Sequence, residues 1–136
     1  MALGRVPVAG RNVVAWVETH VGTLREARAL AQRALEARLA ACANLGAIES
    51  AYRWEGTLER RREVRVELKT DRRRLRALLE FVKAEHPYEV PYIAWGEGLQ
   101  VTAAYRAWAS RETGPARTRP RPAATRRGTR GTRRRT

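Results

Sequence analysis

The chain has 136 residues, a formal net charge of +14 and a single cysteine. This length fits one domain. No apolar run approaches the roughly 20 residues that span a bilayer, and residues 1–10 lack the continuous apolar core of a secretory signal. One cysteine excludes an internal disulfide and a zinc site of the Cys-x-x-Cys kind. These features predict a cytoplasmic protein.

The positive charge is distributed unevenly. Residues 114–136 contain nine arginines and no acidic residue, which leaves a charge of only +5 on the first 113 residues. The same segment has no large apolar residue, so it cannot bury enough surface to fold. The sequence therefore predicts a flexible N-terminus over residues 1–11, a domain over residues 12–113 and a disordered arginine-rich tail over residues 114–136.

The first predicted elements are a strand and a helix. Residues 13–17 (VVAWV) form a short apolar run typical of a buried strand. Thr23 and Glu26 form a capping box, and apolar residues then repeat at intervals of three and four as far as Leu39, which predicts an amphipathic helix. His20, between the two elements and without a metal-binding neighbour, is expected in a loop.

A β-hairpin follows. Alternation with a period of two places Ile48, Ser50, Tyr52 and Trp54 on one strand face, and the run breaks at Gly56-Thr57. The returning strand over residues 63–70 alternates strictly, with Val64, Val66 and Leu68 directed inward and Arg65, Glu67 and Lys69 directed outward.

The last third of the domain predicts a helix, a strand and a final helix. Asp71 is placed to cap the first of these helices, which must end near His86 because Pro87 disfavours helical geometry in the residue before it. Residues 91–95 predict a short strand, Gly96–Gly98 a turn, and residues 100–112 the final helix.

This order of elements predicts an α+β fold. Strand-helix-strand-strand-helix-strand is the ferredoxin-like arrangement, in which two helices cover one face of a four-stranded antiparallel sheet. The other face is left uncovered. Tyr52 and Trp54 on the hairpin indicate that another subunit covers it.

Four strings in the same order and spacing carry a family resemblance. They are RLAACANLGAIESAYRWEG (38–56), LKT (68–70), HPYEVP (86–91) and the pair Tyr105 and Trp108. Together they resemble the CutA family of divalent-cation tolerance proteins. The resemblance implies a cytoplasmic homotrimer that binds copper or other divalent metal ions, takes part in the response to metal ions and has no accepted catalytic activity. The chain also lacks a Ser/His/Asp set or close carboxylate pair that would indicate an enzyme.

The resemblance also implies candidate metal ligands. Cys42 and His86 match family residues implicated in metal contact, and Glu89 could add a carboxylate oxygen across a turn. Each has a structural alternative. A free cysteine is commonly a small buried hydrophobe, and a histidine at a helix C-terminus can bond the last carbonyls.

Two departures from the family pattern bear on these expectations. Tyr92 follows Val90-Pro91 where the family has glutamate, and a phenol keeps its proton to about pH 10, so weak metal binding is expected. Arg65 and Glu67 stand in a strand that the family keeps apolar. Together with Tyr52 and Trp54 they are the candidate trimer interface, where the charges must pair across subunits or be solvated.

Two other functions remain open. One is a signalling trimer similar to PII proteins that binds a small ligand at subunit clefts, although no glycine-rich phosphate loop supports it. The other is attachment to nucleic acid through the tail, for which the candidate residues are Arg126, Arg127, Arg133, Arg134 and Arg135. The 26 arginines against 2 lysines in the whole chain also fit arginine-biased codon usage. An RNA-binding domain is disfavoured because residues 63–70 have no aromatic side chain on which bases could stack.

Overall fold

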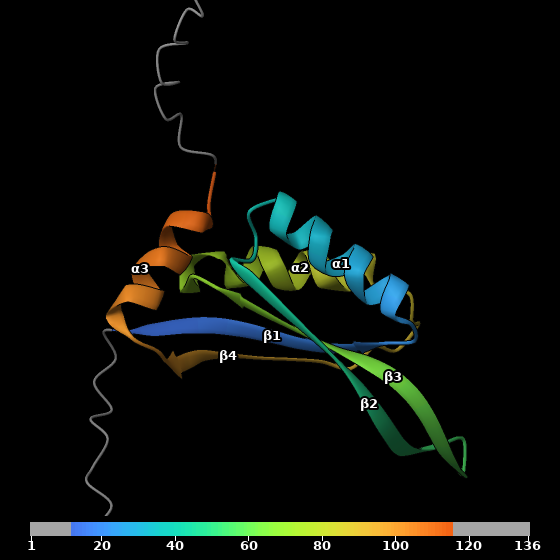
Figure 1. Ribbon diagram of the computed structural model, residues 1–136. Coiled ribbons are helices and arrows are strands. Elements are labelled where there is room, and N and C mark those ends of the chain that lie inside the picture. Colours follow the sequence, from blue (N-terminus) through green and yellow to red (C-terminus); the bar gives the residue numbers. More distant parts are fainter. Residues whose placement is uncertain (1–11, 116–136) are drawn as a thin grey trace, which may run out of the picture.

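A computed structural model describes residues 12–115 and has the predicted order of elements (Figure 1). These are β1 (Val13–Val21), α1 (Leu24–Glu36), β2 (Cys42–Trp54), β3 (Thr57–Thr70), the 3-10 helix η1 (Arg72–Arg74), α2 (Leu75–Glu85), β4 (Ile93–Gln100) and α3 (Ala103–Glu112). The α+β, ferredoxin-like prediction is confirmed. The predicted flexible N-terminus and nearly all of the predicted tail lie outside the described residues.

The four strands form one antiparallel sheet in the order β2-β3-β1-β4. Helices α1 and α2 lie side by side on one face of the sheet and leave the second face uncovered, and α3 lies at one end of β1 (Figure 1). We call these the covered face and the open face. The largest fully buried side chains include Val17, Val66 and Leu68 from the sheet and Leu78 and Val82 from α2. None of the helices in residues 12–115 has the length and apolar character needed to cross a bilayer.

The helix boundaries follow their predicted caps. The Thr23 Oγ1 accepts a hydrogen bond of 3.1 Å from the backbone N–H of Glu26 at the start of α1. Asp71 caps η1 rather than α2 itself: its Oδ1 accepts from the Arg73 N–H at 2.9 Å, and η1 runs directly into α2. Helix α2 ends at Glu85, one residue before His86, as the following proline requires. The final helix begins at Ala103, after the cap Thr102, and not at residue 100.

The hairpin is longer than the sequence predicts. Strand β3 begins at Thr57, whereas alternation predicted it only from residue 63, because residues 57–62 are exposed on both faces and only Leu58 among them is apolar. The turn is Glu55–Gly56, and both residues have positive φ, as a two-residue hairpin turn requires. Strand β1 pairs with β3 only over residues 64–70. Residues 48–63 therefore form a two-stranded hairpin arm that projects from the sheet (Figure 1).

The predicted turn at Gly96–Gly98 is wrong, because both glycines lie inside β4. A Cβ on Gly96 would lie 2.6 Å from the Trp16 indole nitrogen on the neighbouring strand. Gly96 is therefore needed for the close approach of Trp16 and not for a turn. The register between the two strands shifts next to Gly96. Val14 pairs with Leu99 and Trp16 pairs with Gly96, so a step of two residues along β1 corresponds to three residues along β4. The extra residue in β4 is a β-bulge.

The predicted strand of residues 13–17 continues to Val21, and this corrects the expectation for His20. His20 lies within β1, paired with Arg65 of β3, and not in a loop. Its ring lies 4.6 Å from the Tyr92 ring, measured between centroids. The sequence missed this extension because Glu18 and His20 are polar residues on the open face, where they interrupt the apolar run.

Candidate functional site

His86 is held at the end of α2 by three contacts. Its Nδ1 accepts a hydrogen bond of 3.0 Å from the Tyr88 N–H. Its Nε2 lies 3.0 Å from the His20 carbonyl oxygen and 2.9 Å from the Thr19 Oγ1. A carbonyl only accepts, so Nε2 carries the proton and the ring is the neutral Nε2–H tautomer. Both ring nitrogens are therefore engaged within the chain.

The surroundings of His86 favour this neutral form. Burial lowers the pKa of His86, and it outweighs the His20 hydrogen bond and the nearby carboxylates of Glu26 and Glu63, which act to raise that pKa. A neutral imidazole is the form that binds a metal ion. A metal at Nδ1 would have to displace the hydrogen bond from the Tyr88 N–H.

Tyr88 connects the loop after α2 to the hairpin. Its hydroxyl donates a hydrogen bond of 3.0 Å to the Glu63 Oε2, and Glu63 is buried although it is charged. Burial and this bond raise the pKa of Tyr88 to about 12. Glu89, the next residue, is exposed in the same loop. The loop is thus fixed at His86 and Tyr88, while the Glu89 carboxylate faces solvent.

Cys42 begins β2 and is half-buried. Its Sγ lies 3.6 Å from the Asn44 Oδ1, which also accepts a hydrogen bond of 2.8 Å from the Lys69 Nζ. Burial and the proximity of Cys42 raise the pKa of the Tyr105 phenol to about 12. These contacts place the thiol in a packed corner between the sheet and α3.

The structure does not bring Cys42 and His86 together within one chain. Cys42 pairs with Lys69, and Thr19, which contacts His86, pairs with Val66. Residues 66 and 69 point to opposite sides of a strand, so Cys42 lies on the open face and His86 on the covered face. Within residues 12–115 no group of three His, Cys, Asp or Glu side chains is arranged to hold a metal ion.

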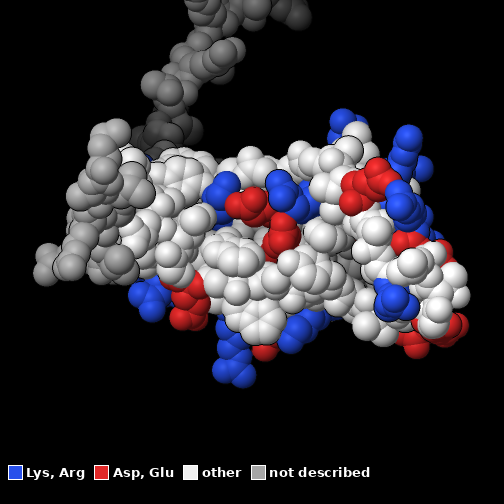
Figure 2. Space-filling model, turned by 90° about the horizontal axis from the view of Figure 1, so that it is seen from below, with Lys and Arg blue, Asp and Glu red and all other residues white. Residues whose placement is uncertain are grey.

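The open face has paired charges at its centre. Glu18 and Glu67 are directly opposite each other on β1 and β3. Each has its own cation, because the Arg65 Nε lies 3.5 Å from Glu18 and the Lys69 Nζ lies 3.5 Å from Glu67. Figure 2 shows acidic and basic side chains side by side there, surrounded by uncharged surface. Arg65 and Glu67 thus find partners within the chain, an arrangement that the sequence did not suggest.

Sequence reasoning missed Trp16 and Glu18 as residues of this face. With Glu67 and Leu99 they line a hollow of about 220 Å³. The Glu18 carboxylate also accepts a hydrogen bond of 3.0 Å from the Tyr92 hydroxyl, so Tyr92 is held toward the open face. Extending the alternation of residues 13–17 to His20 would have found both residues.

The other predicted interface residues lie on the hairpin arm. Tyr52 is half-buried and Trp54 is 50% exposed, and Leu58 on the opposite strand is 71% exposed. The arm therefore presents large apolar side chains to solvent. Arg126, Arg127 and Arg133–Arg135, the candidates for nucleic-acid binding, lie outside the described residues, so that expectation stays a prediction.

Comparisons with known proteins identify the family. A family model described as "CutA1 divalent ion tolerance protein" matches residues 15–112. The divalent-cation tolerance protein CutA of Thermococcus kodakarensis is 38% identical over 62% of this chain and 82% of its own length. The protein of that name in Pectobacterium atrosepticum is 48% identical over 48% of this chain and 60% of its own length.

Solved structures agree in fold. Divalent ion tolerance protein CutA1 from Ehrlichia chaffeensis has a TM-score of 0.73 at 25% identity and covers 77% of this chain and 99% of its own. A protein from Archaeoglobus fulgidus, named a periplasmic divalent cation tolerance protein CutA, has a TM-score of 0.67 at 30% identity and covers 71% of this chain and 94% of its own. The family model spans every strand and helix of the domain except the first residues of β1, and the chain belongs to the CutA1 divalent ion tolerance family.

Proposed function

We propose that this chain forms a homotrimer that binds copper or other divalent cations in the cytoplasm and takes part in the response to metal ions. The observation that carries the proposal is the family match over residues 15–112. The role is binding and not catalysis. The cytoplasmic location rests on the sequence alone. The structural neighbours do not add to it, because one of them is named periplasmic.

The open face and the hairpin arm support assembly. An isolated two-stranded hairpin is marginally stable in water, yet residues 48–63 extend beyond the rest of the sheet with Trp54 and Leu58 exposed. Pairing or packing against another copy would bury these side chains. The charges of the open face are already paired within the chain, so Arg65 and Glu67 can enter an interface as salt bridges and not as isolated charges.

The same architecture supports a cation site shared between subunits. Cys42 and His86 lie on opposite faces of one sheet, and Glu89 is exposed in the loop after α2. One chain therefore offers separate single ligands, and a site with several ligands needs residues from more than one subunit. We expect the binding to be weak, because Tyr92 replaces a carboxylate and a metal at His86 must displace a hydrogen bond.

A copper titration of the full chain tests this function. The chain has only two histidines and one cysteine, so the background of strong ligands is low. We expect His86→Ala to weaken Cu(II) binding by about tenfold, the loss of one good ligand interaction, while the matched control His20→Ala binds as the unchanged chain does. Equal affinity in both variants would remove His86 from the site. Absence of saturable binding to any divalent cation would contradict the proposal as a whole.

A further inference from the structure

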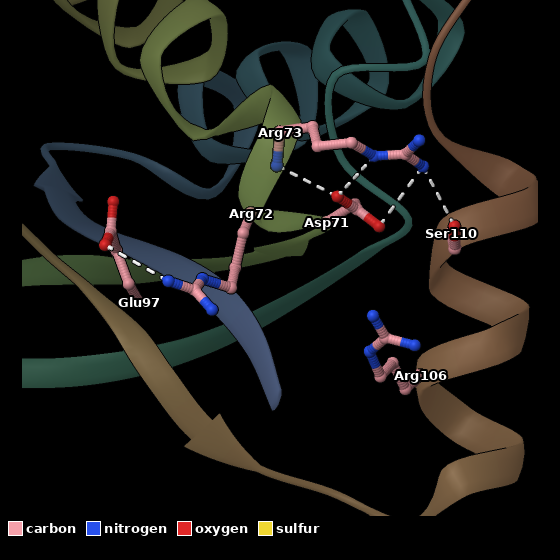
Figure 3. A pocket seen from close by; sticks show the side chains of 6 residues that line it. All are labelled: Asp71, Arg72, Arg73, Glu97, Arg106 and Ser110. Atoms are coloured by element: carbon pink, nitrogen blue, oxygen red, sulfur yellow. Dashed lines mark hydrogen bonds and ion pairs between the residues drawn. The ribbon is translucent and has the colours of Figure 1, made fainter. Parts of the chain in front are cut away.

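A cleft of about 570 Å³ lies where η1, β4 and α3 meet. Its lining is Asp71, Arg72, Arg73, Glu97, Arg106 and Ser110, and Figure 3 shows their side chains around one open space. The cleft is at the α3 end of the molecule, away from the hairpin arm (Figure 1). It shares no residue with the open-face surface proposed for assembly.

One of the three arginines in the cleft is held by hydrogen bonds to its neighbours. The Arg73 guanidinium lies 3.0 Å and 3.4 Å from the two Asp71 carboxylate oxygens and 3.0 Å from the Ser110 Oγ. Burial alone would raise the pKa of Asp71, but the hydrogen bonds and charge of Arg73 hold it below its usual value. Asp71 and Arg73 thus form an ion pair along one side of the cleft.

The other two arginines have unused donors. The Arg72 guanidinium approaches Glu97 only to 3.9 Å, too far for a hydrogen bond. The Arg106 backbone N–H bonds to the Thr102 carbonyl at the start of α3, while its guanidinium makes no hydrogen bond or ion pair with any residue in the range 12–115. The two guanidinium groups extend from different elements into the same space (Figure 3). The lining has three arginines against the two carboxylates of Asp71 and Glu97, so it keeps a net positive charge of +1, which attracts an anion.

The donors determine the class of anion. A guanidinium fork matches the oxygens of phosphate or carboxylate in a bidentate way. Two guanidinium groups on different elements fit a tetrahedral phosphate, whose oxygens point in several directions, better than the planar oxygen pair of a carboxylate. The Ser110 hydroxyl accepts a hydrogen bond from Arg73 and itself bonds to the Asp71 carboxylate, so it belongs to the wall of the cleft. We propose that this cleft binds the phosphate group of a small molecule between Arg72 and Arg106.

The test is calorimetric titration of the full chain with inorganic phosphate, pyrophosphate and AMP at about 0.15 M salt, where long-range attraction to the tail is screened. We expect saturable binding of at least one of them at one site per chain. The double variant Arg72→Gln/Arg106→Gln should weaken it by about tenfold or more, since charged hydrogen bonds are lost. The three ligands distinguish a free phosphate ion from a phosphate ester.

The matched control is Arg126→Gln/Arg127→Gln, which removes the same charge from the tail. It should bind as the unchanged chain does. Circular dichroism should show that both double variants are folded, because Arg72 and Arg106 are exposed and Arg126 and Arg127 lie outside the described residues. Equal weakening in the two double variants would assign the binding to overall charge and overturn the proposal. Absence of saturable binding in the unchanged chain would also overturn it.

Discussion

The two faces of the sheet are made by the same four strands but are completed in different ways. On the covered face, Val17, Val66 and Leu68 are fully buried beneath α1 and α2. On the open face, the intervening residues of the same strands include Trp16, Glu18 and Glu67, which line a shallow hollow. Alternation along a strand thus divides one sequence between two environments.

This difference separates folding from assembly. The covered face is dry and closed within a single chain, so its residues determine the stability of the domain. The open face and the hairpin arm hold aromatic side chains and paired charges that α1 and α2 do not cover. Substitutions on the covered face should therefore change the free energy of unfolding, whereas those on the arm should change association.

The largest effect on stability is expected for Leu68→Ala. Leu68 is 0% exposed, and removing a buried leucine side chain costs about 2–5 kcal/mol because a cavity remains. The matched control is Leu24→Ala, at a side chain that is 46% exposed in the first turn of α1, for which a change within about 0.5 kcal/mol is expected. Urea unfolding at one fixed protein concentration measures both. Equal losses would contradict the division between covered and exposed positions.

A smaller loss is expected for Gly96→Ala, which tests the packing of the open face. The new methyl group would lie 2.6 Å from the Trp16 indole nitrogen, so the indole or the strand must move. Overpacking of this kind costs about 1–3 kcal/mol.

The control for this substitution is Gly98→Ala, two residues along the same strand, where a Cβ meets no atom within 4 Å. We expect Gly98→Ala to be neutral or slightly stabilising. Thermal unfolding followed by tryptophan fluorescence compares the two variants. A Gly96→Ala protein as stable as the Gly98→Ala protein would show that Trp16 does not lie over β4.

The smallest effect concerns His86 on the covered side. Because its pKa is lowered in the folded chain, the unfolded chain binds more protons near the ordinary histidine pKa of about 6.5. The stability from neutral His86 is complete above that pH and is lost as the pH falls through the folded pKa. Unfolding free energy, measured with a chelator present, should therefore decrease below about pH 6.5. His86→Gln should reduce the dependence of the unfolding free energy on pH, and His20→Gln should retain it. The same pH dependence in both variants would show that His86 is not its source.

The sequence predicted the covered face more fully than the open one. In residues 63–70 apolar and charged side chains alternate, so the inward set Val64, Val66 and Leu68 was evident and is confirmed. Residues 13–17 are nearly all apolar, which conceals the alternation that places Trp16 on the open face. The arm was underestimated because residues 57–62 have no apolar period.

The candidate site was predicted as a set of residues but not as an arrangement. The strings around Cys42 and His86 could be recognised locally, yet their separation onto opposite faces depends on the register between β1, β2 and β3. The partners of His86, Thr19 and the His20 carbonyl, are more than 60 residues away in the chain. Gly96 was misread for the same reason, since its role depends on Trp16 across the sheet.

The central claim is that copies of this chain complete the open face and the arm. Light scattering of the full chain after size-exclusion chromatography tests it most directly. We predict a mass three times that of the 15.4 kDa chain, and a decrease toward one chain for Trp54→Glu, which places a charge among the exposed apolar side chains of the arm, with an unchanged circular dichroism spectrum. A mass of one chain for the unchanged protein at micromolar concentration would contradict the account.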